Sequence, residues 1–339
     1  MLPLAVLTRC AQLAAQLVLT FLGLTAVTFV IGRVIPIDPV IAIVGDRASQ
    51  SVYEKVRMEL GLDRPLYEQY LTYLGKILEG DFGTSVLTSQ PVLQDIFRFF
   101  PATLELATIA TIIGVLLGVP MGVAAAVYQG RWIDHAIRLI GLVGYSVPVF
   151  WLGLIGLLVL YAQLDLVAGP GRLDIFLEDI VEPVTGLILI DAAIAREWEV
   201  WENAFDHVLL PSGILGYYSL AYIARMTRSF MLEQLRQEYI VTARVKGMSE
   251  ARIIWVHAFG NILVPLITVI ALSYAFLLEG SVLTETVFAW PGLGLYITNS
   301  LFNADMNAVL GGTLVVATCF IALNLFSDML YKVFDPRTR

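Results

Sequence analysis

The sequence predicts an all-α, polytopic membrane protein with six transmembrane helices. Hydrophobic residues make up 58% of the 339 positions and charged residues only 15%, whereas soluble domains carry about 25% charged residues. A membrane helix needs about 20 consecutive apolar residues. Uncharged runs reach or approach that length six times: Ala11–Gly32, Leu106–Gly130, Leu139–Leu164, Val208–Ala224, Ala258–Leu278 and Met306–Ser327.

The first and fourth runs need separate arguments. The first lies in residues 1–35, the N-terminus and first transmembrane helix. Its apolar run is too long for a signal peptide, and no A-x-A cleavage site follows it. The fourth run is short and contains Pro211. We retain it because the basic segment that follows would otherwise have no helix from which to leave the membrane.

Charge divides the loops between the two sides of the membrane. Lys and Arg are enriched in cytoplasmic loops. The short loop with Arg131 and Arg138, the segment Arg225–Arg252 with six basic and three acidic residues, and the basic C-terminal tail fall on one side. The stretch Asp165–Asp206, with ten acidic and two basic residues, falls on the other. We therefore expect both termini in the cytoplasm.

Residues 36–100 are expected to form a small helical subdomain on the outer face. Ser51 and Glu54 have the spacing of a capping box, and Gly61 suits the end of the helix that follows. Pro65 suits the first turn of a second helix. An apolar stripe on this second helix is expected to pack against the membrane domain, with a ligand site as the alternative: Tyr67, Tyr70, Leu71, Leu74 and Leu78.

The remaining residues, 101–339, are expected to form a core of five transmembrane helices. An external (periplasmic) insertion, residues 165–206, interrupts this core and has a helical pattern at Asp191–Phe205. Within the second apolar run, small residues one helical turn apart are expected to let helices pack closely: Gly114, Gly118 and Gly122.

A basic segment between two apolar runs, residues 225–261, is termed the elbow segment below. Its residues over Met231–Lys246 favour a helix, with no Pro or Gly. Gly247 is then a natural left-handed stop, and Ser249 is placed to cap a second helix that runs through His257 into the fifth span. The sequence therefore predicts two short helices that meet at an angle.

Two interpretations of the elbow segment agree with its charge. Basic amphipathic helices often lie on lipid headgroups. However, the elbow segment also contains three acidic residues, and it has no Trp or Phe between Met231 and Trp255. A helix that enters a groove of another protein explains this mixed charge better.

The elbow segment resembles a loop that occurs in the members of a known family. The sequence Thr-Ala-Arg-Val-Lys-Gly-Met-Ser at 242–249, then His257 and Asn261, then Pro265, which follows Gly247 by 18 residues, resembles the cytoplasmic loop of binding-protein-dependent ABC importer permeases of the dipeptide/oligopeptide family. Further segments resemble the same family in the same order: Glu79–Ser85, Pro101–Leu106, Ile223–Ser229, Glu285–Gly294 and Asp335–Arg337. The resemblance covers nearly the whole chain.

This resemblance implies the type I ABC importer permease fold in a bacterial cell inner (plasma) membrane. It implies a permease subunit that forms half of a path for dipeptides or oligopeptides. The implied partners are a homologous second permease subunit, two cytosolic ATPase subunits and a periplasmic solute-binding protein. No cofactor is expected in this chain, since the ATPase subunits would bind ATP and Mg²⁺. Nickel chelates, glutathione and other small solutes, which the same family also imports, remain alternative cargoes.

The resemblance also implies that the elbow segment docks in a cleft of the ATPase and transmits its motion to the spans. The expected coupling residues are Glu238, Ala243, Arg244, Lys246, Gly247 and Ser249. Two positions depart from the family pattern. Val241 stands where the general importer loop begins with Glu, and Gly260 stands where the peptide branch often has Arg.

Three acidic residues are candidates for the substrate path, because ionisable groups at membrane depth tend to be functional. Glu279 lies at the outer end of the fifth span and Glu105 at the outer start of the second, where a carboxylate can receive the ammonium group of a peptide. Asp305 lies near the last span. The alternative is that the two glutamates lie at the headgroup level, exposed to water, and that Asp305 belongs to a solvated loop.

Enzymatic function is not expected. The three His residues form no H-E-x-x-H motif, and neither a G-x-S-x-G motif nor a Walker A loop occurs. No catalytic residue and no metal site are therefore expected. The net charge of −8 does not suggest a nucleic-acid partner, and Cys10 and Cys319 are expected to be packing thiols. A secondary carrier, which would usually show inverted repeats and more spans, is a more remote alternative.

Overall fold

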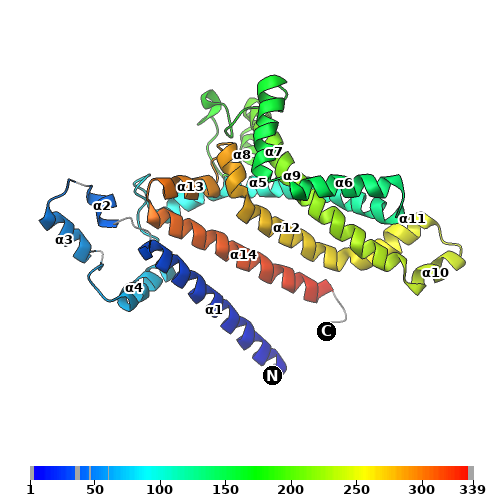
Figure 1. The fold of residues 1–339 in the computed structure, drawn as a ribbon, viewed down its shortest axis with the longest axis horizontal. Coiled ribbons are helices and arrows are strands. Elements are labelled where there is room, and N and C mark those ends of the chain that lie inside the picture. Colours follow the sequence, from blue (N-terminus) through cyan, green and yellow to red (C-terminus); the bar gives the residue numbers. More distant parts are fainter. Residues whose placement is uncertain (1–3, 35–38, 46, 60, 335–339) are drawn as a thin grey trace. The chain divides into compact units, whose positions relative to one another are not determined.

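A computed structural model describes residues 4–34, 39–45, 47–59 and 61–334 (Figure 1). This part of the chain is helical and contains no strand beyond an isolated bridge between Thr84 and Pro91, which confirms the all-α class. The helices are α1 (Leu4–Val34), α2 (Pro39–Val44), α3 (Gln50–Glu59), α4 (Leu66–Leu78), α5 (Val92–Val127), α6 (Trp132–Ser146), α7 (Val149–Gly156), η1 (Leu157–Gln163), η2 (Ile175–Leu177), α8 (Ile188–Ala195), α9 (Trp198–Leu235), α10 (Glu238–Val245), α11 (Glu250–Arg252), η3 (Ile253–Ala258), α12 (Phe259–Val287), α13 (Leu293–Phe302) and α14 (Met306–Phe334).

The chain forms two compact units that do not follow its order. The first unit contains Met1–Arg98 and Tyr296–Thr318, and the second contains Phe99–Leu295 and Cys319–Arg339. The first unit therefore combines the expected outer subdomain with part of the last apolar run. The expected tail motif at 335–337 lies outside the described residues.

Four helices in the described ranges are long and apolar enough to cross a membrane: α1 over Ala15–Gly32, α5, the continuous helix Glu250–Val287, and α14 over Met306–Ser327. The third expected span is broken, since α6 and the α7–η1 stretch meet at 98°. The physical cause is Pro148, because a residue that precedes proline avoids helical backbone. Val147 is accordingly extended, with φ −96° and ψ 127°. This bent pair is a fifth candidate span.

The fourth expected span lies inside α9, a helix of 38 residues. By length and composition α9 is not one of the candidate spans. It carries polar side chains that neighbouring helices bury, among them His207, Ser212 and Ser219. The count of six spans therefore stays a prediction.

In the first unit, α4 packs on α1 with a face that differs from the expected stripe. The Tyr70 hydroxyl contacts Thr25 Oγ1 at 3.0 Å, and the Tyr73 hydroxyl contacts Thr28 Oγ1 at 3.2 Å. Phe29 of α1 lies against both tyrosine rings. The stripe prediction was wrong for three of its members, which are exposed: Tyr67, Leu71 and Leu78. The contact surface of α1 selects Tyr70 and Tyr73, and spacing alone cannot reveal that choice.

The capping box predicted at Ser51 was also wrong. Helix α3 begins at Gln50, and Val52 and Tyr53 donate their backbone N–H groups to Ser49 O. The Ser49 carbonyl therefore accepts the first backbone hydrogen bonds of the helix, which places Ser51 inside the first turn and not at the N-cap. The end was predicted correctly: Gly61 has φ +66° and closes the helix.

In the second unit, α9 lies along both α6 and α12 (Figure 1), and the glycines of α5 lie against it. A Cβ on Gly114 would lie 2.3 Å from Ser219 Oγ, one on Gly118 would lie 3.0 Å from Leu220 O, and one on Gly122 would lie 2.6 Å from Ala224 O. These distances are shorter than van der Waals contact, so only glycine allows the two backbones to approach this closely. The predicted packing role of the three glycines is confirmed.

We expect Gly122→Leu to lower the free energy of unfolding by about 1–3 kcal/mol, because overpacking a close contact forces backbone shifts. Unfolding temperature followed by tryptophan fluorescence of the purified protein checks this. Gly213→Leu is the matched control, since nothing lies within 4 Å of a Cβ at that position of α9. Equal unfolding temperatures for the two variants would contradict the close packing.

The insertion at 165–206 does not contain the helix expected at Asp191–Phe205. Helix α8 ends at Ala195 because Arg196 has left-handed backbone, φ +61°. Helix α9 then begins at Trp198 and continues without interruption to Leu235. The helical pattern is thus divided by one residue whose backbone changes the chain direction.

Candidate functional site: the elbow segment and the outer carboxylates

The elbow segment contains a break that the sequence did not indicate. Helix α9 ends at Leu235 and α10 begins at Glu238, so the expected continuous helix over Met231–Lys246 was wrong. Gln237 is extended, with φ −75° and ψ 150°. The residues on both sides of Gln237 favour a helix. The break nevertheless turns α10 back onto the ends of the long helices, where the apolar face of α10 is buried.

Gly247 ends α10 as predicted. Its φ is +75°, its N–H donates to Arg244 O at 2.9 Å, and the Met248 N–H donates to Ala243 O at 3.2 Å. This pair of hydrogen bonds is the Schellman motif, which requires a left-handed residue. Nothing lies within 4 Å of a Cβ at Gly247, so the requirement for glycine comes from the backbone angle and not from crowding.

After this turn the second helix starts as expected. Ser249 occupies the N-cap position of α11 with extended backbone, although its side chain makes no capping hydrogen bond. Helix α11 continues through the π-helical η3 into α12, so one unbroken helix joins Glu250 to Val287. A displacement of the turn therefore acts directly on a membrane-length helix.

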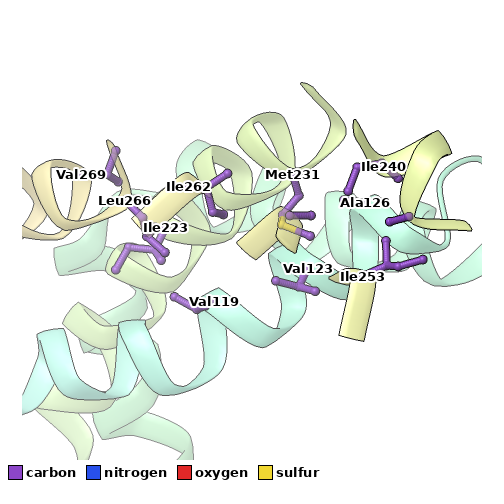
Figure 2. Close-up of a cluster of buried hydrophobic side chains, with 12 residues drawn as sticks. Val119, Val123, Ala126, Ile223, Met231, Ile240, Ile253, Ile262, Leu266 and Val269 are labelled. Carbon is purple, nitrogen blue, oxygen red and sulfur yellow. The ribbon is translucent and has the colours of Figure 1, made fainter. Parts of the chain in front are cut away.

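The inner face of the elbow segment packs into a buried hydrophobic cluster (Figure 2). Ile240 and Ala243 of α10 and Ile253 of η3 are buried there. Their partners come from α5 (Val119, Val123 and Ala126), α9 (Ile223 and Met231), the end of η3 (Ala258) and the first half of α12 (Ile262, Leu266 and Val269). The expected coupling residue Ala243 thus faces inward, where its small side chain permits close packing with the chain's own helices.

The charged coupling residues lie on the outer face. The Arg244 guanidinium donates to the Glu250 carboxylate across the Gly247 turn, at 2.9 Å to Oε1 and 3.2 Å to Oε2. This hydrogen bond raises the pKa of Arg244 above its usual value, so the guanidinium remains charged. Glu238 and Lys246 are exposed. The bidentate pair joins α10 to α11 and supports the angle between them.

Two apolar residues on the same outer face were not among the expected coupling residues. Val241 is 55% exposed and Val245 is 83% exposed, and they lie one helical turn apart on α10. Their signal was available, because an apolar pair at this spacing opposite Ile240 and Ala243 leaves a second apolar face. The outer surface of α10 is therefore apolar in its middle and charged at its edges.

Asn261 is a further residue whose role only the structure shows. Its Nδ2 donates to the Tyr239 hydroxyl at 3.0 Å and to His257 O at 3.0 Å, and Tyr239 donates to Gln234 Oε1 at 2.9 Å. These bonds connect α12, α10 and the end of α9. The neighbouring Gly260, which stands where the peptide branch often has Arg, is exposed. A Cβ at this position would have no atom within 4 Å.

At the other end of the second unit, Glu105 is buried and paired. Arg172 Nη2 lies 2.6 Å from Glu105 Oε2, and the Leu189 N–H donates to Oε1 at 3.0 Å. Arg172 also donates to Gly186 O and lies over the Trp290 ring. This carboxylate therefore anchors the insertion at 165–206 and already has a cationic partner.

Asp305 is also engaged, within the first unit. Its Oδ2 accepts from Ser85 Oγ at 2.5 Å and from Leu87 N at 3.2 Å. Ser85 ends the Glu79–Ser85 motif, and a Cβ on Gly83 of that motif would lie 2.9 Å from Asn307. The motif thus folds against the start of α14, with Asp305 fully buried.

Glu279 differs from the other two acidic candidates. It is exposed on α12, and no hydrogen bond or ion pair joins it to another described residue. Two turns later on the same helix lies Glu285, a fully buried carboxylate that was not expected from the sequence to be a site residue.

Glu285 organises the outer motif Glu285–Gly294. Thr103 donates to its Oε1 at 2.7 Å, Ser281 donates to the same oxygen at 2.9 Å, and the Leu295 N–H donates to Oε2 at 3.0 Å. A Cβ on Gly292 would lie 2.5 Å from the same carboxyl group. The glycine spacing of the motif therefore makes room for this carboxylate.

Two family models and several known proteins match most of this chain. The chain matches the family described as "Binding-protein-dependent transport system inner membrane component" over residues 118–339, and its N-terminal companion family over residues 6–107. It is 44% identical over 321 residues to the probable D,D-dipeptide transport system permease protein DdpB of Escherichia coli K12, covering 95% of this chain and 94% of that protein. It is 42% identical to the di/tripeptide transport system permease protein DppB of Pseudomonas aeruginosa UCBPP-PA14, covering 98% of this chain and 99% of that protein.

A solved structure gives the same fold at low sequence identity. The methionine ABC transporter MetNI in inward-facing conformations aligns with a TM-score of 0.54 and 17% identity, over 73% of this chain and 99% of the matched chain. The family consists of membrane components, in agreement with the expectation of a non-catalytic subunit. The two named permeases match nearly the whole chain at 44% and 42% identity, and the family model matches residues 118–339. The chain therefore belongs to the inner membrane component family of binding-protein-dependent ABC transport systems.

Proposed function

We propose that this chain is the permease subunit of an ATP-driven importer of dipeptides or oligopeptides and forms half of the translocation path. The relatives with 42% and 44% identity over almost their whole length are named as dipeptide and di/tripeptide permeases, and this near-complete coverage carries the proposal. Mass spectrometry of the molecules that the purified system's binding protein retains tests the cargo. Retention of peptides supports the proposal, and retention of a nickel chelate, glutathione or a sugar alone contradicts it.

The proposed assembly contains a homologous second permease, two cytosolic ATPase subunits and a periplasmic binding protein, with ATP and Mg²⁺ on the ATPase subunits. Both termini of this chain lie in the cytoplasm, as the distribution of Lys and Arg predicts. In this orientation the elbow segment faces the ATPase, and the insertion at 165–206 faces the binding protein.

The outer face of α10 is the proposed contact with the ATPase. Val241 and Val245 supply apolar area that a groove can cover, and Arg244 and Lys246 flank them. The opposite face is fixed in the buried cluster with Ile240. A close-packed cluster transmits displacement because it has few alternative arrangements. Movement of the ATPase is thereby passed to α5, α9 and α12.

A cysteine at Val245 is expected to crosslink to the ATPase subunit in native membranes. The experiment uses a background in which Cys10 and Cys319, the two cysteines of the chain, are replaced by serine. Cysteine at Ile175, which is 87% exposed in the external insertion, is the matched control and should give no such product. Labelling of the Val245 position by a lipid-soluble reagent, without an ATPase crosslink, would contradict the docking role.

Glu279 is the acidic path candidate without a partner among the described residues, and we expect Glu279→Gln to reduce peptide uptake while basal ATP hydrolysis continues. The reason is the loss of a carboxylate that can receive the peptide ammonium group. A charge-assisted hydrogen bond contributes about 1.5–3 kcal/mol, so uptake at low peptide concentration should fall about tenfold or more. Glu182→Gln, an exposed carboxylate in the insertion, is the control. Unchanged uptake kinetics in Glu279→Gln would remove this residue from the path.

A further inference from the structure

A pocket of about 580 Å³ lies between α6 and the second half of α9. It is separate from the outer face of α10 and from the outer carboxylates, and part of its lining comes from the first residues of the elbow segment, Arg225, Arg228 and Ser229. Its basic lining consists of His135 and Arg138 from α6 and Arg225 and Arg228 from α9. All of these residues lie within the second unit.

The pocket has an excess of positive charge. Arg228 is neutralised by Asp134, which it binds at 2.7 Å and 2.9 Å. Among the described residues, no carboxylate lies within ion-pair distance of Arg138 or Arg225. Arg138 interacts with Asp134 at longer range, but this carboxylate is already bound by Arg228. Two guanidinium groups, those of Arg138 and Arg225, therefore line the pocket without an ion pair in the described chain.

Arg225 is held in place by aromatic rings. Its guanidinium lies 4.6 Å from the centre of the Tyr145 ring and 5.9 Å from that of Tyr222, and it donates to the Tyr145 hydroxyl at 3.4 Å. Such contacts fix the plane of the group, yet a guanidinium has five N–H donors. Within the described chain one hydrogen bond, that to Tyr145, uses these donors, so the others can bind an anion.

The rest of the pocket is apolar. Leu139 and Leu142 of α6 line it and are each 62% exposed, and Ala221 and Ala224 of α9 line the opposite wall. The basic residues His135, Arg138 and Arg228 lie toward the ends of α6 and α9 that adjoin the loop at 128–131 and the elbow segment. Arg225 lies on Tyr145, so along α6 the two leucines come between Arg138 and the ring that Arg225 covers.

We propose that this pocket binds one anionic phospholipid, with its phosphate at Arg138 and Arg225 and its acyl chains along Leu139 and Leu142. Basic pockets between membrane helices on the cytoplasmic side are suited to anionic headgroups, and an arginine at this depth requires an anion or water. The assignment to the cytoplasmic leaflet rests on the proposed orientation. A soluble anion would use the arginines but not the exposed leucines, so the apolar wall favours a lipid.

The bound lipid would join α6 to α9 at the first residues of the elbow segment. Arg228 and Asp134 already link these helices by two hydrogen bonds, and Arg225 lies one turn before Arg228 on α9. A phosphate held by Arg138 and Arg225 would add a second link between the same helices. Anionic lipid would therefore stabilise the arrangement from which the elbow segment extends.

The test is lipid retention by the complete transporter in nanodiscs of phosphatidylcholine mixed with phosphatidylglycerol, measured by native mass spectrometry. The wild type should retain phosphatidylglycerol selectively. Each arginine removed should weaken retention about fivefold, so the double variant Arg138→Gln/Arg225→Gln should lose most of it. Arg236→Gln/Arg252→Gln removes the same charge from exposed positions of the elbow segment and should retain lipid like the wild type.

Four outcomes would overturn the proposal. The wild type could retain no phosphatidylglycerol, or the pocket variant could retain as much as its control. Free inorganic phosphate could displace the lipid fully, which would indicate a general anion site. Cysteines at Leu139 and Leu142 could crosslink to the second permease subunit, which would show that protein covers the pocket. Because retention is measured without transport, these results are independent of whether peptide is the cargo.

Discussion

Replacing Gly247 with proline is expected to reduce peptide uptake to background while the protein still inserts in the membrane. Gly247 has φ +75°, whereas proline fixes φ near −65°. Proline also removes the N–H that donates to Arg244 O. Both hydrogen bonds of the turn are then lost. Without them the orientation of α10, with Ile240 in the buried cluster and Val245 on the outer face, is no longer maintained. Uptake of labelled dipeptide, with the quantity of protein in the membrane as reference, measures the effect.

Two controls separate the backbone effect from a general loss of folding. Gly247→Asn should retain most of the uptake, because asparagine enters the left-handed region more readily than other side chains and no neighbour lies within 4 Å. Gly260→Ala, in the same elbow segment and equally free of neighbours, should transport normally. Wild-type uptake in Gly247→Pro would show that the turn does not transmit motion.

Replacing Arg172 with methionine is expected to lower the free energy of unfolding by about 3–5 kcal/mol, since it leaves the buried Glu105 carboxylate without its cation. Both carboxylate oxygens accept hydrogen bonds in the structure, one of them from Arg172. Arg172 also contacts Gly186 O and Trp290, so the insertion should loosen locally. Unfolding temperature and limited proteolysis of residues 165–206 check both effects.

A double-mutant comparison isolates the charge. Arg172→Met/Glu105→Gln should be more stable than Arg172→Met alone, because the neutral amide is cheaper to bury than an unpaired carboxylate. Arg196→Met removes the other basic residue of the insertion, which is exposed, and should leave the unfolding temperature nearly unchanged. If Arg172→Met unfolds at the wild-type temperature, the pair does not hold the insertion.

The features that could be predicted from the sequence are those with a local physical cause. Apolar runs of membrane length follow from composition. The turn at Gly247 follows from its freedom to adopt positive φ, and the close packing at Gly122 follows from the spacing of small residues. None of these requires knowledge of which distant residues meet.

The features that were missed depend on partners far away in the chain. Residues over Met231–Lys246 favour a helix, yet the chain breaks before Glu238 because burial of Ile240 and Ala243 on α5, α9 and α12 outweighs a local preference of less than about 1 kcal/mol per residue. Glu105 resembles a substrate ligand until Arg172 is found beside it. In sequence, Glu285 is simply a charged residue of a loop motif.

By itself, therefore, the sequence determined the helical membrane class, the family resemblance and the place of the bend in the elbow segment. The tertiary structure alone decided which face of α10 is buried, which carboxylates are already paired and which, like Glu279, have no partner among the described residues. The physical reason is that backbone preferences are set by neighbours in the chain, whereas burial and charge pairing are set by neighbours in space.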